Sequence, residues 1–200
     1  MTVQALSGLA AVYVLGLVLL RRARYQLVGY LWSAFGLATL GILWAQLSQW
    51  NVALGRVEAG ALVRLFGWTG LEVGGVERSS LIVTDPAGWS MLNIGLECST
   101  LVESFIFAGL LLFYPRFTAV QRAGRLATGL AAIFAVNLIR LAIIIGMIMW
   151  LGKPGAVMGH AVVGRLVFFA GMILVYWQML TLPTLQMVRQ GLQHPSRTGP

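Results

Sequence analysis

The stretch Leu126–Trp150, LATGLAAIFAVNLIRLAIIIGMIMW, decides the fold of this chain, because Arg140 is the one charged residue among its 25. A helix needs about 20 predominantly apolar residues to cross the hydrocarbon core of a membrane. Leu126–Trp150 is therefore predicted to form a transmembrane helix.

Four further apolar runs extend this prediction to the rest of the 200 residues, at Val3–Leu20, Leu27–Leu47, Gly95–Tyr114 and His160–Leu182. Hydrophobic residues make up 58% of the chain and charged residues 10%, and the mean hydropathy is +0.84. A soluble domain of this size has about a quarter charged residues. We therefore expect an all-α integral membrane protein, a bundle of five to six transmembrane helices in a single domain.

The predicted spans divide the chain into segments. Residues 1–47 hold two spans, 48–94 are expected to form an extracytoplasmic segment, 95–182 hold three spans with the candidate catalytic residues described below, and 183–200 are expected to form a cytoplasmic tail. Within 48–94, GALVRLF (60–66) is typical of a short amphipathic helix at the interface. LEVGGVERSSLIVTDPAGW (71–89) predicts two short strands, a small β-hairpin, followed by a turn at DPAG.

Eight arginines indicate the orientation of the spans. They follow the first span, separate the third from the fourth and lie in the tail, so five spans bring them to one face: Arg21, Arg22, Arg24, Arg116, Arg122, Arg125, Arg189 and Arg197. Cytoplasmic loops are enriched in Lys and Arg. We therefore expect a multi-pass protein of the cell membrane, with its N-terminus outside and its C-terminus in the cytoplasm.

Three reactive side chains are then expected at the outer face. Cys98, the single cysteine, begins the third span there, and His160 begins the fifth. With the fourth span starting at Leu126, Arg140 lies roughly 8 Å beneath the outer edge, given a rise of about 1.5 Å per residue. A thiol, an imidazole and a guanidinium from distant parts of the chain thus reach one depth.

Each of these residues also has a purely structural explanation. A lone cysteine in an apolar helix often packs as a small hydrophobic side chain. Arg140 could extend to the interface or pair with Glu103, and His160 could cap the start of a helix. Arg165, about one turn further in than His160, could likewise extend to the interface or supplement Arg140.

Asn137 is a candidate for a supporting role. It lies three residues before Arg140, so both point to one side of a helix. Its amide could support the buried guanidinium or form an ordinary interhelical hydrogen bond.

The combination of Cys98, His160 and Arg140 suits nucleophilic acyl transfer. A thiolate attacks a carbonyl, a histidine moves the proton to the leaving group, and a fixed cation stabilises the oxyanion. The carboxylates of Glu97 and Glu103 oppose thiolate formation unless a cation offsets them. From the sequence, Arg140 could meet either Cys98 or Glu103.

Other chemistries lack a motif in this sequence. There is no CxxC, HExxH, P-loop or GxSxG pattern, and no usable cluster of metal ligands. We therefore expect no metal, no cofactor and no nucleic-acid partner.

Three blocks of this sequence resemble the signature blocks of the exosortase/archaeosortase family: ECSTLVESFIFAGLLLFYP (97–115), VNLIRLAIII (136–145) and GHAVVGRLVFF (159–169). Many members have about eight spans, so this chain resembles a compact branch. Members often carry glycine two residues after the cysteine, where this chain has Thr100.

The resemblance implies a membrane-embedded cysteine transpeptidase. It carries over Cys98 as the nucleophile, Arg140 as the arginine of an N-x-x-R block and His160 as the third catalytic residue. The implied partners are client proteins with a C-terminal motif, a transmembrane helix and a basic cluster, which are cleaved through an acyl-enzyme and transferred to a lipid or glycan acceptor. Membrane lipid is a further expected partner, because it surrounds the spans.

Two other interpretations compete with this one. The chain could be a non-catalytic membrane subunit or small transporter component in which Arg140 and Glu103 form a structural pair. It could also be an acyltransferase that uses the thiol on a lipid rather than a peptide. The client motif, the acceptor and the oligomeric state do not follow from the sequence.

Overall fold

A computed structural model describes residues 3–71, 73–76, 79–86, 88–96 and 98–193 of the chain. The structure is mostly helical, at 79%, with a small three-stranded sheet, so the predicted helical class is confirmed. Four helices within the described residues are long and apolar enough to cross a membrane: Gln4–Arg22, Gln26–Leu47, Ala119–Leu151 and Lys153–Gln186.

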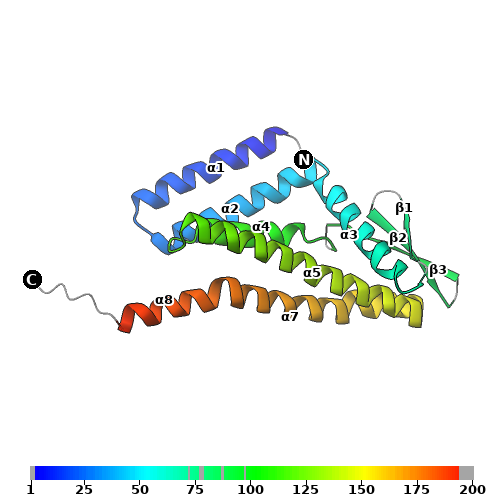
Figure 1. The fold of residues 1–200 in the computed structure, drawn as a ribbon. Helices are drawn as coiled ribbons and strands as arrows, with labels where there is room; N and C mark the ends of the chain where they lie inside the picture. Colours follow the sequence, from blue (N-terminus) through cyan, green and yellow to red (C-terminus); the bar gives the residue numbers. More distant parts are fainter. Residues whose placement is uncertain (1–2, 72, 77–78, 87, 97, 194–200) are drawn as a thin grey trace, which may run out of the picture.

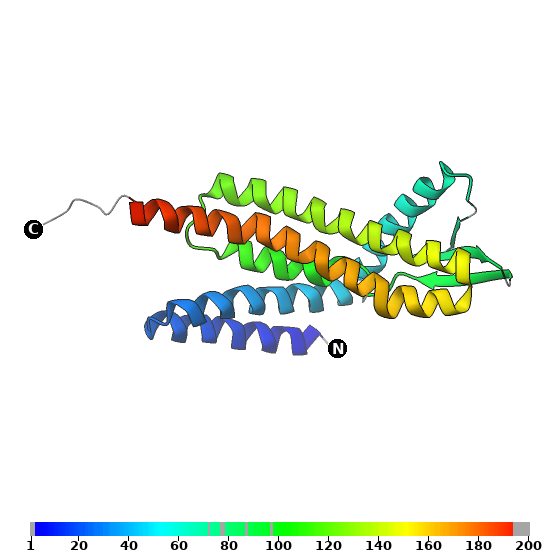
Figure 2. The ribbon, with the colours of Figure 1, turned by 90° about the horizontal axis from the view of Figure 1, so that it is seen from below.

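The helices form three layers (Figures 1 and 2). Helices α1 (Val3–Arg22) and α2 (Gln26–Leu47) make one hairpin, and α4 (Leu101–Leu112) packs against α2. On the other side of α4 lies α5 (Ala119–Leu151), which pairs with a continuous helical run. That run consists of α6 (Lys153–Met158), η2 (Gly159–Val163), α7 (Gly164–Tyr176), η3 (Trp177–Thr181) and α8 (Leu182–Gln193), where η2 and η3 are π-helical turns.

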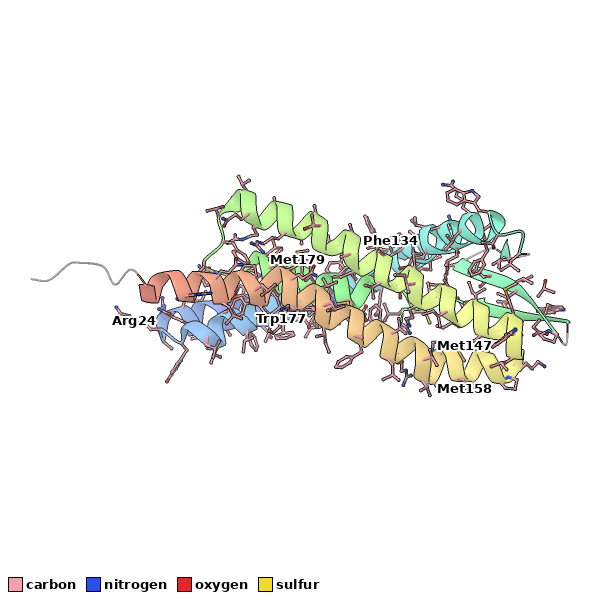
Figure 3. The ribbon with its side chains drawn as sticks, turned by 60° about the horizontal axis from the view of Figure 1, so that its bottom comes forward. Arg24, Phe134, Met147, Met158, Trp177 and Met179 are labelled. Atoms are coloured by element: carbon pink, nitrogen blue, oxygen red, sulfur yellow. The ribbon has the colours of Figure 1, made fainter. Side chains whose placement is uncertain are left out.

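The two ends of the bundle differ in character. The turn between α1 and α2, the loop between α4 and α5, and α8 all lie at one end, whereas α3 (Trp50–Gly67) and the sheet lie at the other (Figure 1). Figure 3 shows Arg24 at the first end and Met147 and Met158 at the second. The arginine-bearing connections that the sequence places on one face are thus together in space.

The sheet is antiparallel and consists of β1 (Val73–Val76), β2 (Ser80–Asp85) and β3 (Gly88–Asn93), with β2 in the centre. Leu81 and Val83 of β2 are fully buried, in a core with Ile144 and Ile148 of α5. The sequence predicted two strands and a turn at DPAG. A third strand was missed, because the turn reverses the chain and lets Gly88–Asn93 pair along the whole of β2.

The third predicted span, Gly95–Tyr114, was wrong in length. Its helix α4 covers Leu101–Leu112, which is 12 residues or about 18 Å. The preceding residues form a turn in which the N–H groups of Cys98 and Ser99 both donate to the carbonyl of Gly95, at 3.0 and 2.9 Å. Cys98 therefore precedes the helix instead of starting it.

Other boundaries also differ from the prediction. Helix α5 begins at Ala119 and not at Leu126, because Thr118 and Gln121 form a capping box there. The Gly/Pro connection 151–159 shrinks to one residue, Gly152, whose φ of 63° favours glycine. Helix α3 has 18 residues, so it extends well beyond the predicted 60–66.

Helices α2 and α4 approach closely because small residues face each other. Ala34 and Ala38 of α2 are buried, and a Cβ added to Gly109 of α4 would overlap the carbonyl oxygen of Ala34. A backbone carbonyl cannot move aside as a flexible side chain can. Gly109 thus sets the distance between these two helices.

We predict that Gly109→Ala destabilises the protein by about 1–3 kcal/mol, as overpacked cores do. Thermal unfolding in detergent micelles measures the effect. Gly124→Ala on the exposed start of α5 is the matched control, because a Cβ there meets nothing within 4 Å. Equal stabilities of the two variants would contradict the close approach.

Candidate functional site

Cys98 lies in a buried turn where three parts of the chain meet. Its side chain is 5% exposed and belongs to the core formed by α3, the sheet and α5. Ser99 and Thr100 beside it are 1% and 2% exposed, although both are polar. The turn is held by hydrogen bonds and not by apolar packing alone.

His160 is the side chain that meets the thiol. The Cys98 Sγ lies 3.7 Å from the Nδ1 of His160, although 62 residues separate them. His160 lies in the π-helical turn η2, and such single turns occur frequently at functional sites. Gly164 directly follows this turn at a position with no room for a side chain, because a Cβ there would lie 2.5 Å from the carbonyl oxygen of Gly159.

Arg140 projects from the middle of α5 toward the same region. It is 5% exposed, and its Cζ lies 5.1 Å from the ring centroid of Phe168 on α7, a cation–π contact. Arg140 and His160 line one cavity of about 530 Å³. Ligand pockets measure roughly 300–1,000 Å³, so this cavity has the size of a small binding site.

Two more of the predicted residues, Glu103 and Arg165, line this cavity. Arg165 is exposed, whereas the Oε2 of Glu103 is buried and has no hydrogen-bond partner among the described residues. Glu103 and Arg140, whose side chains have opposite formal charges, thus share one cavity. The remaining walls are apolar and come from α7: Leu166, Phe168, Phe169 and Met172. Glu97, a further predicted residue, lies outside the described residues.

A buried hydrogen-bond network holds the Cys98 turn in place, and its centre is Glu58 of α3. The Oε1 of Glu58 accepts hydrogen bonds from the N–H of Thr100 (3.1 Å), the hydroxyl of Thr100 (2.9 Å) and the amide of Asn137 (3.1 Å). The same amide nitrogen of Asn137 donates to the carbonyl oxygen of Cys98, at 2.8 Å. Asn137 thus supports the backbone of the nucleophile candidate.

The charge state of Glu58 follows from its burial. Glu58 is 0% exposed and lies outside the four membrane-length helices. Burial raises the pKa of its carboxyl above the ordinary value, although the hydrogen bonds from Thr100 and Asn137 act in the opposite direction and the nearby Glu103 adds to the rise. Its Oε2 has no hydrogen-bond partner among the described residues. Folding therefore shifts the protonation equilibrium of Glu58 toward the neutral acid.

Glu58 and Thr100 are the site residues that the sequence analysis missed. A signal for Glu58 was present, because the buried residues of α3 recur with helical spacing: Gly55, Glu58, Ala59 and Leu62. A carboxylate within an otherwise apolar stripe requires a partner. Thr100 had been noted only for its position two residues after Cys98.

The arrangement provides the elements of thiol-based acyl transfer. A histidine nitrogen lies within reach of the thiol, and Arg140 lies beside a cavity in which a carbonyl oxygen could develop negative charge. Within the described residues there is no group of three or more His, Cys, Asp or Glu side chains that could hold a metal ion.

Comparison of the chain with protein-family models, curated proteins and solved structures found no match.

We predict that Glu58→Gln preserves stability within about 1 kcal/mol at neutral pH, because the glutamine oxygen accepts the same three hydrogen bonds. Glu58→Ala should cost about 3 kcal/mol or more, since it leaves buried donors of Thr100 and Asn137 unsatisfied. Thermal unfolding of the two variants in detergent micelles gives the comparison.

A comparison of the wild-type protein with Glu58→Gln over a range of pH tests the titration of Glu58. Because its pKa is raised in the folded state, the wild-type protein loses stability as the pH rises through that folded-state pKa, and regains it below. Glu58→Gln should flatten this part of the stability profile. A profile that is unchanged by the substitution would contradict a titrating, buried Glu58.

Proposed function

We propose that this chain is a membrane-embedded cysteine transpeptidase or protease. It cleaves the C-terminal sorting tail of exported proteins through an acyl-enzyme and transfers them to an acceptor. The observation that carries the proposal is the 3.7 Å contact between the Cys98 Sγ and the His160 Nδ1, next to the cavity that Arg140 lines. The resemblance of the three sequence blocks to the exosortase/archaeosortase family supports the same assignment.

In the first half of the reaction His160 takes the proton of the Cys98 thiol. The resulting thiolate attacks the carbonyl carbon of a client peptide bond, and the carbonyl electrons move to its oxygen. When the tetrahedral intermediate collapses, the C–N bond breaks and His160 gives its proton to the leaving amine. The client remains attached to Cys98 as a thioester.

In the second half an acceptor hydroxyl, amine or water approaches the thioester. His160 removes a proton from it, the acceptor attacks the carbonyl carbon, and the C–S bond breaks. The product leaves, and Cys98 is again a thiolate with His160 protonated. No metal or redox partner is needed for atoms and charges to balance.

Arg140 is proposed to stabilise the oxyanion in both halves. Its guanidinium is fixed against Phe168 and is almost fully buried, so little reorganisation is required when negative charge develops. Phe168 and the apolar residues of α7 reduce the access of water, which strengthens this electrostatic interaction. Arg140 also counteracts Glu103, whose negative charge would otherwise oppose thiolate formation.

The site is proposed to lie in the outer half of a cell membrane. A helix of about 18 Å, such as α4, is shorter than the roughly 30 Å hydrocarbon core. Since α4 ends near the arginine-rich end of the bundle, its start leaves Cys98 below the opposite surface. With the arginine-rich end in the cytoplasm, Cys98 and the sheet face outward.

The alternative is a non-catalytic membrane subunit in which Arg140 and Glu103 form a structural pair. The observation in its favour is that both residues, whose side chains have opposite formal charges, line the same cavity. This alternative gives no role to the contact of Cys98 with His160, and a loss of processing without a loss of folding separates the two functions.

We predict that Cys98→Ala and His160→Ala abolish the processing of client proteins, and that Arg140→Gln lowers its rate roughly 100- to 1,000-fold, as loss of an oxyanion-stabilising group does. The measurement is a comparison of C-terminal peptides of exported membrane-associated proteins in cells that produce each variant. Uncleaved C-terminal tails should accumulate.

Arg56→Gln is the matched control for Arg140→Gln, because Arg56 is exposed on α3 and does not line the cavity of Arg140. All variants should accumulate in the membrane at wild-type levels. Normal client maturation in Cys98→Ala would eliminate the transpeptidase function.

Two introduced cysteines in a Cys98→Ala background test the proposed membrane orientation. Trp89 on the sheet is 66% exposed and Val120 at the start of α5 is 84% exposed, so both positions are reactive when replaced. A membrane-impermeant maleimide should label Trp89→Cys in intact cells and Val120→Cys only after permeabilisation. The reverse pattern would invert the proposed topology.

A further inference from the structure

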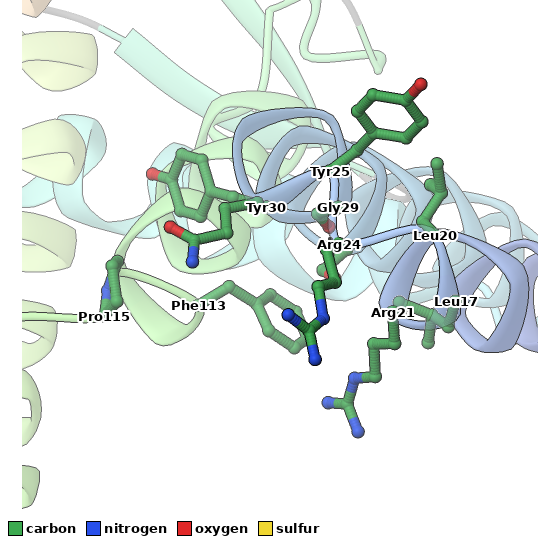
Figure 4. A pocket seen from close by; sticks show the side chains of 11 residues that line it. Leu17, Leu20, Arg21, Arg24, Tyr25, Gly29, Tyr30, Phe113 and Pro115 are labelled. Atoms are coloured by element: carbon green, nitrogen blue, oxygen red, sulfur yellow. Dashed lines mark hydrogen bonds between the residues drawn. The ribbon is translucent and has the colours of Figure 1, made fainter.

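A second cavity lies at the arginine-rich end of the bundle, at the opposite end of α4 from Cys98. It measures about 740 Å³ and is enclosed by the turn between α1 and α2 and by the end of α4. Arg21 and Arg24 line it from the turn, and Phe113, the residue that follows α4, lines it from the other side (Figure 4). The catalytic proposal does not use any of these residues.

The charge of this cavity is uniformly positive. Arg21 and Arg24 are its ionised lining residues, and none of the described residues that line it is acidic. The six acidic residues of the chain lie between positions 58 and 103, whereas the cavity is built from residues 17–33 and 113–115. Figure 4 shows both guanidinium groups on the same side of the turn, with Arg24 extending toward Phe113. Two neighbouring cations in a partly enclosed site repel each other unless an anion joins them.

The cavity offers neutral donors beside the two cations. Gln26 and Tyr25 line it at the start of α2. This helix begins without a side-chain cap, so N–H groups of its first turn remain available to an anion. Phosphate is one of the anions that guanidinium groups and helix N–H groups bind.

The walls of the cavity are held in a fixed geometry. The hydroxyl of Tyr30 donates to the carbonyl of Leu110 at 2.9 Å, and its ring meets Tyr114 edge to face with a centroid distance of 6.3 Å. Arg24 has a φ of 56°, in the left-handed region that residues other than glycine and asparagine seldom adopt. This backbone conformation is what reverses the chain and places Arg24 at the cavity.

We propose that this cavity binds the phosphate-bearing headgroup of an anionic membrane phospholipid. Arg21 and Arg24 bind the phosphate, and the half-buried side chains of Leu17, Leu20 and Phe113 contact the adjoining part of the acyl chains.

The surroundings favour a lipid over a soluble phosphate compound. None of the membrane-length window of α1 is buried inside the protein, so this helix presents apolar side chains along its whole length to whatever surrounds it. A phospholipid suits both the arginines of the cavity and the apolar surface of α1, since its headgroup binds the arginines and its acyl chains cover the helix. A soluble phosphate would satisfy only the first.

This proposal rests on the membrane insertion that the proposed function also requires, but not on the chemistry of Cys98. Its failure would leave the transpeptidase proposal intact, because this cavity shares no lining residue with the cavity of Arg140 and His160, and the length of α4 separates it from Cys98. Failure of catalysis would equally leave the lipid site intact.

The test uses the full-length chain in phosphatidylcholine nanodiscs, with and without phosphatidylglycerol. Phosphatidylglycerol should raise the thermal unfolding midpoint of the wild-type protein. The variants are Arg21→Gln and Arg24→Asn, where asparagine keeps the left-handed conformation accessible. Each should weaken phosphatidylglycerol binding about fivefold and both together roughly 25-fold, as expected for arginines close to anionic lipid.

Arg22→Gln is the matched control, because Arg22 is an exposed neighbour in the same turn that does not line the cavity. It should bind phosphatidylglycerol like the wild-type protein, and an equal loss in Arg22→Gln would overturn the proposal in favour of general surface charge. Stabilisation by soluble glycerol phosphate to the same extent would overturn the lipid assignment. If the double variant does not fold, Arg21→Gln alone, at an ordinary helical position, decides the outcome.

Discussion

The structure depends on one buried carboxyl group, that of Glu58. It collects donors from two other elements, the start of α4 through Thr100 and the middle of α5 through Asn137. A buried carboxyl without such partners would carry a large desolvation penalty, so α3 can pack there only when both neighbours are in place. The core around it, with Leu62, Ile94 and Ile145, is the apolar shell of this polar centre.

The geometry around Cys98 follows from this network. Asn137 uses one amide nitrogen for both Glu58 and the carbonyl of Cys98, so the position of the thiol is coupled to α3 as well as α5. The helical run after Gly152 then brings His160 to the thiol. Arg140, one turn after Asn137 on α5, is placed by the same helix against Phe168. The long helix α5 is thus the common support of the candidate site.

The sequence predicted the parts of this protein that depend on local pattern. Apolar runs of membrane length and the β-rich segment after α3 follow from hydropathy and spacing. The expectation of a common membrane depth for Cys98, Arg140 and His160 stays a prediction, although the structure brings Cys98 to His160 and places His160 in one cavity with Arg140. The third strand, the shortened α4 and the role of Glu58 could not be predicted in this way. Each depends on contacts between residues far apart in the chain, such as the 42 positions between Glu58 and Thr100. The stripe of α3 showed only that Glu58 needed a partner, not which one.

The central claim is that Cys98 forms a thioester with a client protein. Mass spectrometry of the protein, isolated from membranes under conditions that preserve thioesters, tests it most directly. The account predicts an adduct on Cys98 that hydroxylamine removes. The Cys98→Ser variant, which has no thiol, should carry no thioester adduct. A Cys98 that remains unmodified while client proteins are processed normally would contradict the account.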